Sequence, residues 1–198
     1  MVKIKNKKLN KNKKKENFEK FHQGHLLDNE TYIGGKEKNK HKHKRIEGTQ
    51  GRSTKTKSAI VGILERKGNL VAKVVNKVNT KTLQQIIFNH IEIGSNIHTD
   101  EFKAYNSVKS FYNQEQVNHR QGEYVKGNCH TNSIESFWAL FKRGFVGIYH
   151  QMSKKHLQRY IDEFVFRFNN RDLSLEEFFD KILINSLNKR LKYKELIC

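Results

Sequence analysis

The stretch SAIVGILERKGNLVAKVV at residues 58–75 contains two apolar, β-branched runs that are separated by Lys67-Gly68. Two such runs around a glycine-containing break predict a β-hairpin with strands at residues 58–66 and 69–75. An earlier run, LLDNETYI at residues 26–33, ends at the Gly34-Gly35 pair and predicts another strand. We therefore expect three consecutive strands to open one β-sheet.

The segments after the hairpin alternate between helical and extended patterns. Leu83, Ile87 and Ile91 recur at helical spacing, which predicts a helix over residues 80–91. The remaining elements follow in order: a strand at 96–100, a short helix at 101–109, a strand at 115–119, and helices at 132–144, 153–171 and 175–193. This order predicts an α/β fold with a mixed β-sheet flanked by helices and additional C-terminal helices.

The composition is strongly basic, with 39 Lys and Arg against 20 Asp and Glu and a formal net charge of +19. Such an excess predicts attraction to nucleic acid that weakens as salt rises, although a solvated Lys-rich surface is the alternative. Residues 1–20 contain nine lysines and predict a disordered basic tail. Residues 36–55 predict a long mobile loop, and residues 186–198 a basic C-terminal helix end.

The cysteines, the N-terminal segment and the lengths of the apolar runs indicate where in the cell the protein is expected. Cys129 and Cys198 form no C-x-x-C pair and no disulfide framework, which fits a reducing cytoplasm. The basic start has no apolar run after it, so we expect no secretory signal. No stretch approaches the roughly 18 apolar residues that a membrane span requires, so we expect no membrane partner.

Three acidic positions are candidates for a metal site. Asp100 follows a predicted strand, and open α/β sheets place ligands at the carboxyl ends of their strands; its alternative role is a helix N-cap. Glu135 and Lys142 are seven residues apart, so they share one face of the predicted helix. The alternative for Glu135 is a capping box with Asn132.

The third acid must come from the first strand. Asp28 and Glu30 point to the same face of that strand, with Asn29 between them on the other. Exposed acids on a strand are usually surface charges. This pattern therefore indicates a metal site only in combination with Asp100 and Glu135. Three carboxylates from separate elements are what two-metal phosphoryl transfer requires, and hard ions such as Mg²⁺ prefer oxygen ligands.

Several segments taken together resemble one family, the ISXO-like insertion-sequence transposases, over about residues 20–180. The similar segments are NETYIGGK at 29–36, GRSTKTKSAIVGILERKG at 51–68, HTDEFKAY at 98–105, HTNSIESFWALFKRG at 130–144 and HQMSKKHLQRYIDEFVFRFNNR at 150–171. The resemblance implies a ribonuclease-H-like catalytic domain at residues 21–185 that cleaves and transfers DNA strands at insertion-sequence ends, using two Mg²⁺ or Mn²⁺ ions.

Roles for individual residues follow from this resemblance. It implies that Asp100 is the second metal ligand and Glu135 the third, while Lys142, with Arg143 beside it, contacts DNA. Its partners would be the element ends and the target DNA, with a homo-oligomer as the acting form, in the bacterial cytoplasm at the nucleoid. His119 falls in a segment resembling the family's strand before the third-acid helix, without an assigned role.

The sequence departs from the family pattern in two places. The family's first Asp falls on Asn29, and Asp28 stands one residue earlier, so either a β-bulge brings Asp28 into the site or the first carboxylate is missing. The N-terminal zinc-ribbon and helix-turn-helix region of the family has no counterpart here, which predicts a truncated copy. The alternatives to an active enzyme are a catalytically impaired DNA-binding remnant and a basic RNA- or ribosome-associated protein.

Overall fold

The structure is a computed structural model that describes residues 20–21, 26–35, 37–47, 53, 55–66, 68–99, 103–116, 132–187 and 189–194. The side chains of residues 26–29, 37, 103–104, 106, 115–116 and 132 are not among those described. Residues 1–19 of the predicted tail, Asp100, His119 and both cysteines lie outside the described residues.

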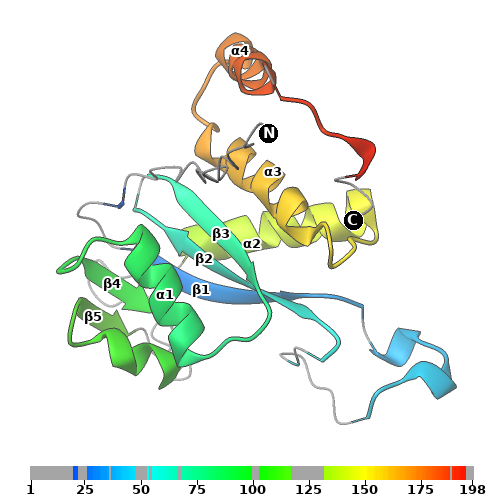
Figure 1. Cartoon of the computed structure of the whole chain (residues 1–198), viewed down its shortest axis with the longest axis horizontal. Coiled ribbons are helices and arrows are strands. Elements are labelled where there is room, and N and C mark those ends of the chain that lie inside the picture. The colour runs from blue at the N-terminus through cyan, green and yellow to red at the C-terminus, as the bar shows by residue number, and fades with distance from the viewer. Residues whose placement is uncertain are drawn as a thin grey trace, which may run out of the picture.

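Five strands form one mixed sheet in the order β3-β2-β1-β4-β5. The strands are β1 (Leu26–Ile33), β2 (Ser58–Leu64), β3 (Leu70–Val75), β4 (Asn96–Thr99) and β5 (Asn113–Gln116). The first three pair antiparallel as the predicted hairpin requires, whereas β4 and β5 run parallel to β1. The expected mixed α/β sheet is confirmed, and its strand order suits the ribonuclease-H-like class (Figure 1).

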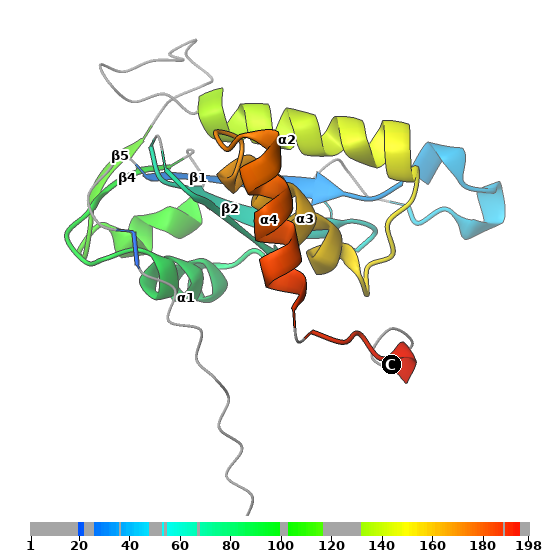
Figure 2. The ribbon, with the colours of Figure 1, turned by 90° about the horizontal axis from the view of Figure 1, so that it is seen from above.

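Helices cover both faces of this sheet, as Figure 2 shows. One face carries α1 (Thr80–His90) and the 3-10 helix η3 (Lys103–Val108). The other carries α2 (Asn132–Gly144), the π-helical turn η5 (Phe145–Tyr149) and α3 (Leu157–Asn169). A further helix, α4 (Leu175–Ser186), lies beyond the end of α3 (Figure 1).

The interior strand β2 explains why helices cover both faces of the sheet. Residues 59–64 are all buried, so its two sets of alternating side chains both face a core. Ile60 and Leu64 belong to the apolar cluster beneath α2 and α3. Val61 and Ile63 belong to the cluster beneath α1 and η3. The continuous apolar run in the sequence therefore becomes a strand with no solvent face.

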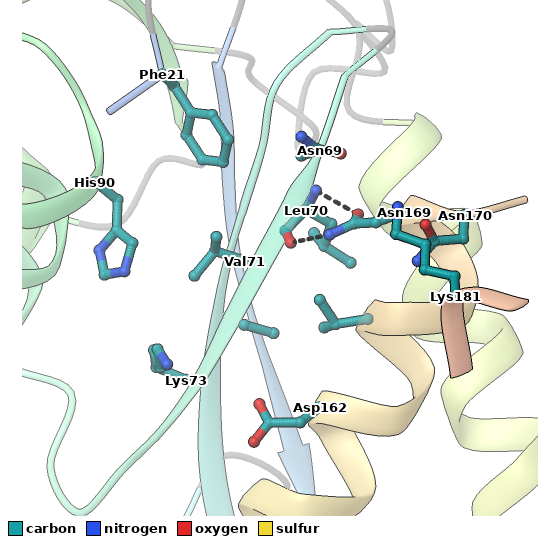
Figure 3. Close-up of a pocket in the computed structure, with 12 residues that line it drawn as sticks. Phe21, Asn69, Leu70, Val71, Lys73, His90, Asp162, Asn169, Asn170 and Lys181 are labelled. Carbon is teal, nitrogen blue, oxygen red and sulfur yellow. Dashed lines mark hydrogen bonds between the residues drawn. The ribbon is translucent and has the colours of Figure 1, made fainter. Parts of the chain in front are cut away.

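The outer edge of β3 is closed by two amide side chains of α3. Asn169 accepts a hydrogen bond from the Leu70 N–H at 2.7 Å and donates one to the Leu70 carbonyl at 2.9 Å (Figure 3). Gln158 accepts from the Val74 N–H at 2.8 Å and donates to the Ala72 carbonyl at 3.0 Å. These bonds occupy main-chain groups that an open edge would offer to another strand.

The predicted loop and the last predicted helix differ from the structure. The predicted loop contains two 3-10 turns, η1 (Glu37–Asn39) and η2 (Lys42–Lys44), so residues 37–47 have a defined conformation. The Arg45 guanidinium fixes these turns by donating to the carbonyls of Lys38 and Lys40 at 2.8 and 2.9 Å. The last helix ends at Ser186 instead of continuing to residue 193, because Leu187 leaves the helical region with ψ near 135°.

Candidate functional site

The candidate site lies where β1, the carboxyl end of β4 and the start of α2 meet. β1 pairs parallel with β4, and Asp28 is the partner of Thr99, the last residue of β4. Asp100 follows Thr99 directly in the sequence, although it lies outside the described residues. The pairing therefore brings the backbone at Asp28 beside the end of the strand that precedes the second predicted acid in the sequence.

The pairing between β1 and β2 is regular across this region. Each residue from Leu27 to Ile33 has a single partner on β2, from Leu64 back to Ser58. A β-bulge would place two residues of one strand opposite one of the other. No such interruption occurs in this paired stretch, so the bulge that we considered for Asp28 is not present in the described backbone.

The register assigns positions 28 and 29 to opposite faces of the sheet, because cross-strand partners share a face. Asp28 is paired with Ile63, which lies in the cluster beneath α1. Asn29 is paired with Gly62, where an added Cβ would meet the Trp138 ring of α2 at 2.5 Å. Position 29, and not position 28, therefore lies on the face that α2 covers.

The helix α2 presents the third predicted acid to solvent. Its apolar side is buried against the sheet through Ile134, Phe137, Trp138 and Phe141. Glu135 in its first turn is exposed, and so are Lys142 and Arg143 in its last turn. At a rise of about 1.5 Å per residue, Glu135 and Lys142 lie roughly 10 Å apart along the helix axis.

Two buried polar atoms lie on the α2 face of the sheet. The Thr31 hydroxyl and the Trp138 indole N–H have no hydrogen-bond partner among the described residues, although both residues are only 3% exposed. Thr31 is paired with Ile60 and so shares the face of Gly62. Buried polar groups normally have hydrogen-bond partners. These two atoms make the contact between α2 and the sheet partly polar at this point.

Glu30, the other acid of β1, has a different environment. It lies one residue beyond Asn29 and pairs with Val61, on the α1 side of the sheet. The Tyr105 hydroxyl of η3 donates a hydrogen bond to its carboxylate at 3.0 Å. This contact ties β1 to η3, which gives Glu30 a structural partner away from α2.

The described side chains contain no cluster of three His, Cys, Asp or Glu residues that could hold a metal ion. Of the three predicted ligands, only Glu135 has a described side chain, so the set as a whole stays a prediction. The described cavities lie elsewhere. A pocket beside the β3 edge is lined by Lys73, His90 and Asp162 among others (Figure 3), two strands away from β1.

Comparison with known proteins settles the family. Residues 22–169 match the ISXO2-like transposase domain, a span that runs from just before β1 to the end of α3. The chain belongs to this family of transposase domains. It is also similar to an uncharacterized transposase-like protein of Haemophilus influenzae, with 29% identity over 101 residues that cover 50% of this chain and 80% of that protein.

The family match confirms the resemblance that the sequence motifs indicated. The matched span contains all five strands and the three helices that cover the sheet, whereas α4 lies beyond it. The transposase domain also contains each candidate site position from Asp28 to Arg143. Among the described residues, no helix is both long enough and apolar enough to cross a membrane.

Proposed function

We propose that this transposase domain cleaves and transfers DNA strands at insertion-sequence ends, using divalent ions held by Asp100, Glu135 and a first ligand on β1. The observation that supports this most is the convergence of three elements. β1 pairs with β4 as far as Thr99, the residue that precedes Asp100 in the sequence. Helix α2, with Glu135 in its first turn, covers the face of the sheet on which Gly62, the β2 partner of Asn29, lies.

The donor set suits Mg²⁺ or Mn²⁺, which take carboxylate and amide oxygens. When bound, a pair of such ions stabilises the attacking and leaving oxygens of a phosphoryl transfer. The chain itself holds the acids on separate elements and positions the DNA. Lys142 and Arg143 lie exposed farther along α2, where their cations can bind backbone phosphates on the same side of the molecule.

The identity of the first ligand decides how active the domain is. The regular register favours Asn29 as the position that faces α2, in agreement with its place in the family motif. An amide oxygen binds a divalent ion without contributing charge, so a site with Asn29 binds metal more weakly than one with three carboxylates. A catalytically impaired DNA-binding domain is therefore the second candidate function, and this register is what favours it.

A comparison of two substitutions on β1 tests both candidates. Mn²⁺ binding is measured by isothermal titration calorimetry, and nicking of supercoiled plasmid is measured in Mn²⁺, on the full chain. We expect Asn29→Asp to bind Mn²⁺ at least ten-fold more tightly and to nick faster, whereas Asp28→Ala changes neither. Glu135→Gln is the control that removes the third carboxylate and abolishes nicking in the Asn29→Asp background.

The opposite pattern would reassign the site. If Asp28→Ala abolishes nicking and Asn29→Asp has no effect, Asp28 is the first ligand. If Asn29→Asp gains metal affinity but no nicking, the chain is a DNA-binding domain without strand chemistry. If no variant changes Mn²⁺ binding, the proposed metal site is wrong.

The DNA contact is tested separately through salt dependence. Each lost phosphate contact lowers the slope of log affinity against log salt by about 0.9 for duplex DNA. We expect Lys142→Ala to lower the slope by about one such contact, and Lys109→Ala to leave it unchanged because Lys109 follows η3 on the other side of the sheet. Equal slopes for both variants would show that Lys142 makes no phosphate contact.

A further inference from the structure

The π-helical turn η5, which continues α2, exposes two apolar side chains. Phe145 and Tyr149 of this turn pack against the cluster beneath α2 and α3. Val146 and Ile148 lie outside that cluster and are 66% and 72% exposed. Single exposed apolar residues are common on protein surfaces, but these two lie on one turn, on either side of the exposed Gly147. The turn therefore presents a small apolar projection at the end of α2.

Contacts with α3 hold this turn in place. The Tyr149 hydroxyl donates a hydrogen bond to the Glu163 carboxylate at 2.8 Å, and the Tyr149 ring packs edge-on against Tyr160 with centroids 4.9 Å apart. An added Cβ at Gly144, where α2 ends, would overlap the Phe164 ring, so the two helices approach closely there. The two exposed side chains are therefore attached to a backbone that packing fixes.

The backbone of the turn has two uncommon features. π-helical turns are rare and frequently occur at functional sites. His150, which follows the turn, has a φ of 55°, and the Gln151 N–H donates a hydrogen bond to the Tyr149 carbonyl across it. This is the strained, positive-φ form of the γ-turn, and strained backbone is concentrated at functional sites. Both features indicate a function for this turn, and the residues around it indicate the ligand.

Gly147 is a glycine that neither the conformation nor the packing of the described chain requires. Its φ is not among the positive values, and an added Cβ would meet nothing within 4 Å. Glycine in a helical turn is less stable than alanine, but it allows a ligand to approach the backbone closely. Gly147 therefore fits a surface that contacts a ligand, with Val146 and Ile148 on either side of the contact.

The charges around the turn indicate an anionic ligand. Residues 136–156 contain no acid and four bases, which are Lys142, Arg143, Lys154 and Lys155. All four of these side chains are exposed. Glu163 of α3 reaches the turn through Tyr149, but Arg167 balances its charge with an ion pair at 3.0 Å. A surface of this kind attracts the phosphates of DNA.

The position of the turn on α2 places it in line with the DNA contact described above. Val146 is four residues beyond Lys142 and eleven beyond Glu135, so the three lie along one side of the helix. Along the axis, Val146 is roughly 16 Å from Glu135, or about five base steps of duplex DNA. Figure 2 shows α2 along one side of the molecule, with the turn at its far end. DNA that passes over Glu135 and Lys142 therefore reaches the turn.

The size of the apolar projection favours DNA over a protein partner. A standard protein interface buries about 800 Å² on each partner, which is far more than two side chains supply. One or two apolar side chains are enough to enter between base steps from the minor groove, where they unstack the bases and kink the duplex.

We propose that Val146 and Ile148 wedge between base pairs of bound DNA from the minor groove and unstack them locally. The cations on both sides of the turn hold the flanking phosphates, and Gly147 lets the backbone approach the groove. This inference rests on the proposed function, because the DNA path is taken from Glu135 and Lys142.

The first experiment separates contacts with the base pairs from contacts with phosphates. Fluorescence polarisation of a labelled duplex, in EDTA and over a range of salt concentrations, measures its binding to the full chain. We expect Val146→Ser combined with Ile148→Ser to weaken binding about ten-fold, as the loss of two buried apolar side chains implies. The slope of log affinity against log salt should stay the same, because no phosphate contact is lost.

The matched control is Ile184→Ser. Ile184 lies on α4 and is 68% exposed, so it resembles Ile148 in side chain and exposure but not in position. We expect it to leave DNA affinity unchanged. Circular dichroism and Tm of each variant confirm that the fold is retained.

The second experiment detects the unstacking itself. Permanganate oxidises thymines that have left the base stack, so its reactivity is measured along an A·T-rich duplex at saturating protein. We expect wild-type protein to increase thymine reactivity, and the double serine variant to leave it near that of free DNA. Gly147→Gln adds a side chain between the two wedge residues, so it should lower both affinity and thymine reactivity at an unchanged Tm.

The contrary results are specific. Wild-type affinity in the double serine variant would show that the turn does not contact DNA and binds another partner. A smaller salt slope in that variant would show that the turn acts through phosphates alone. Equal permanganate reactivity with wild-type and variant protein would show that the apolar contact does not unstack the bases. All measurements are made without divalent metal, so failure of metal binding or strand cleavage leaves these results unaffected.

Discussion

Gly62→Ala is the substitution whose effect the structure determines most closely. Gly62 lies in the buried interior strand β2 with its α carbon beneath α2. An added Cβ would lie 2.5 Å from Cζ2 and 3.1 Å from Cη2 of Trp138, and 3.2 Å from Cδ1 of Ile134. The contact is with a rigid ring in a filled core, so either the strand or α2 must move to make room.

The size of the effect is the balance of two contributions. Overpacking of a core costs about 1–3 kcal/mol. Replacement of glycine by alanine in a compatible backbone stabilises by about 0.4–1 kcal/mol through the unfolded chain. We therefore expect a net loss of about 1.5 kcal/mol in the free energy of unfolding, or about 3–6 °C in Tm for a chain of this length.

Thermal and urea unfolding measure this loss, and a double-mutant cycle locates it. Trp138→Phe removes the outer indole atoms that the new Cβ would meet, so Gly62→Ala should cost under about 0.5 kcal/mol in that background, as expected when the clash is relieved. Gly147→Ala is the matched control, since a Cβ there meets nothing within 4 Å. A Gly62→Ala protein as stable as wild type would refute the packing of α2 on β2 at this point.

Three further predictions concern other parts of the chain. Asn169→Leu removes both hydrogen bonds to Leu70 at the β3 edge. We expect the free energy of unfolding in urea to fall by about 2 kcal/mol and aggregation to increase. An unchanged urea midpoint would show that these hydrogen bonds do not stabilise the edge strand. Arg45→Ala removes the bonds that fix η1 and η2, so trypsin should cleave residues 37–47 faster at an unchanged Tm; equal cleavage would contradict this role. Hydrogen bonding to Ser174, first to its backbone N–H and then to its side chain, lowers the pKa of Glu177. Its carboxylate therefore stabilises α4 above the ordinary carboxyl pKa, and this stabilisation is lost as pH falls through the lowered value. The protection of α4 amides from exchange, relative to the unfolded chain at the same pH, should fall in acid. Glu177→Gln, which keeps an acceptor without a titrating charge, should remove the pH dependence of this protection.

Local sequence determines most of the elements of this fold. The β-branched runs around Lys67-Gly68 predict β2 and β3 to within two residues at each end, and the run at 26–33 gives β1 with both ends correct. The helical spacing that begins at Asn132 likewise gives α2 as observed. These elements are predictable because the spacing of apolar residues and β-branching are properties of residues that are close together in the sequence. The tertiary contacts then bury the faces that this pattern already makes apolar.

Only the tertiary structure decided which of positions 28 and 29 faces α2. Alternation along β1 separates Asp28 from Asn29, but it does not say which of the two faces lies beneath which helix. The pairing of Asn29 with Gly62 and the position of the Trp138 ring over Gly62 supply that assignment, and these contacts join residues 33 and 76 positions apart in the sequence. The exposure of α4 is likewise a tertiary result. None of its 12 residues is buried, because α4 lies beyond the end of α3 and away from the sheet (Figure 1).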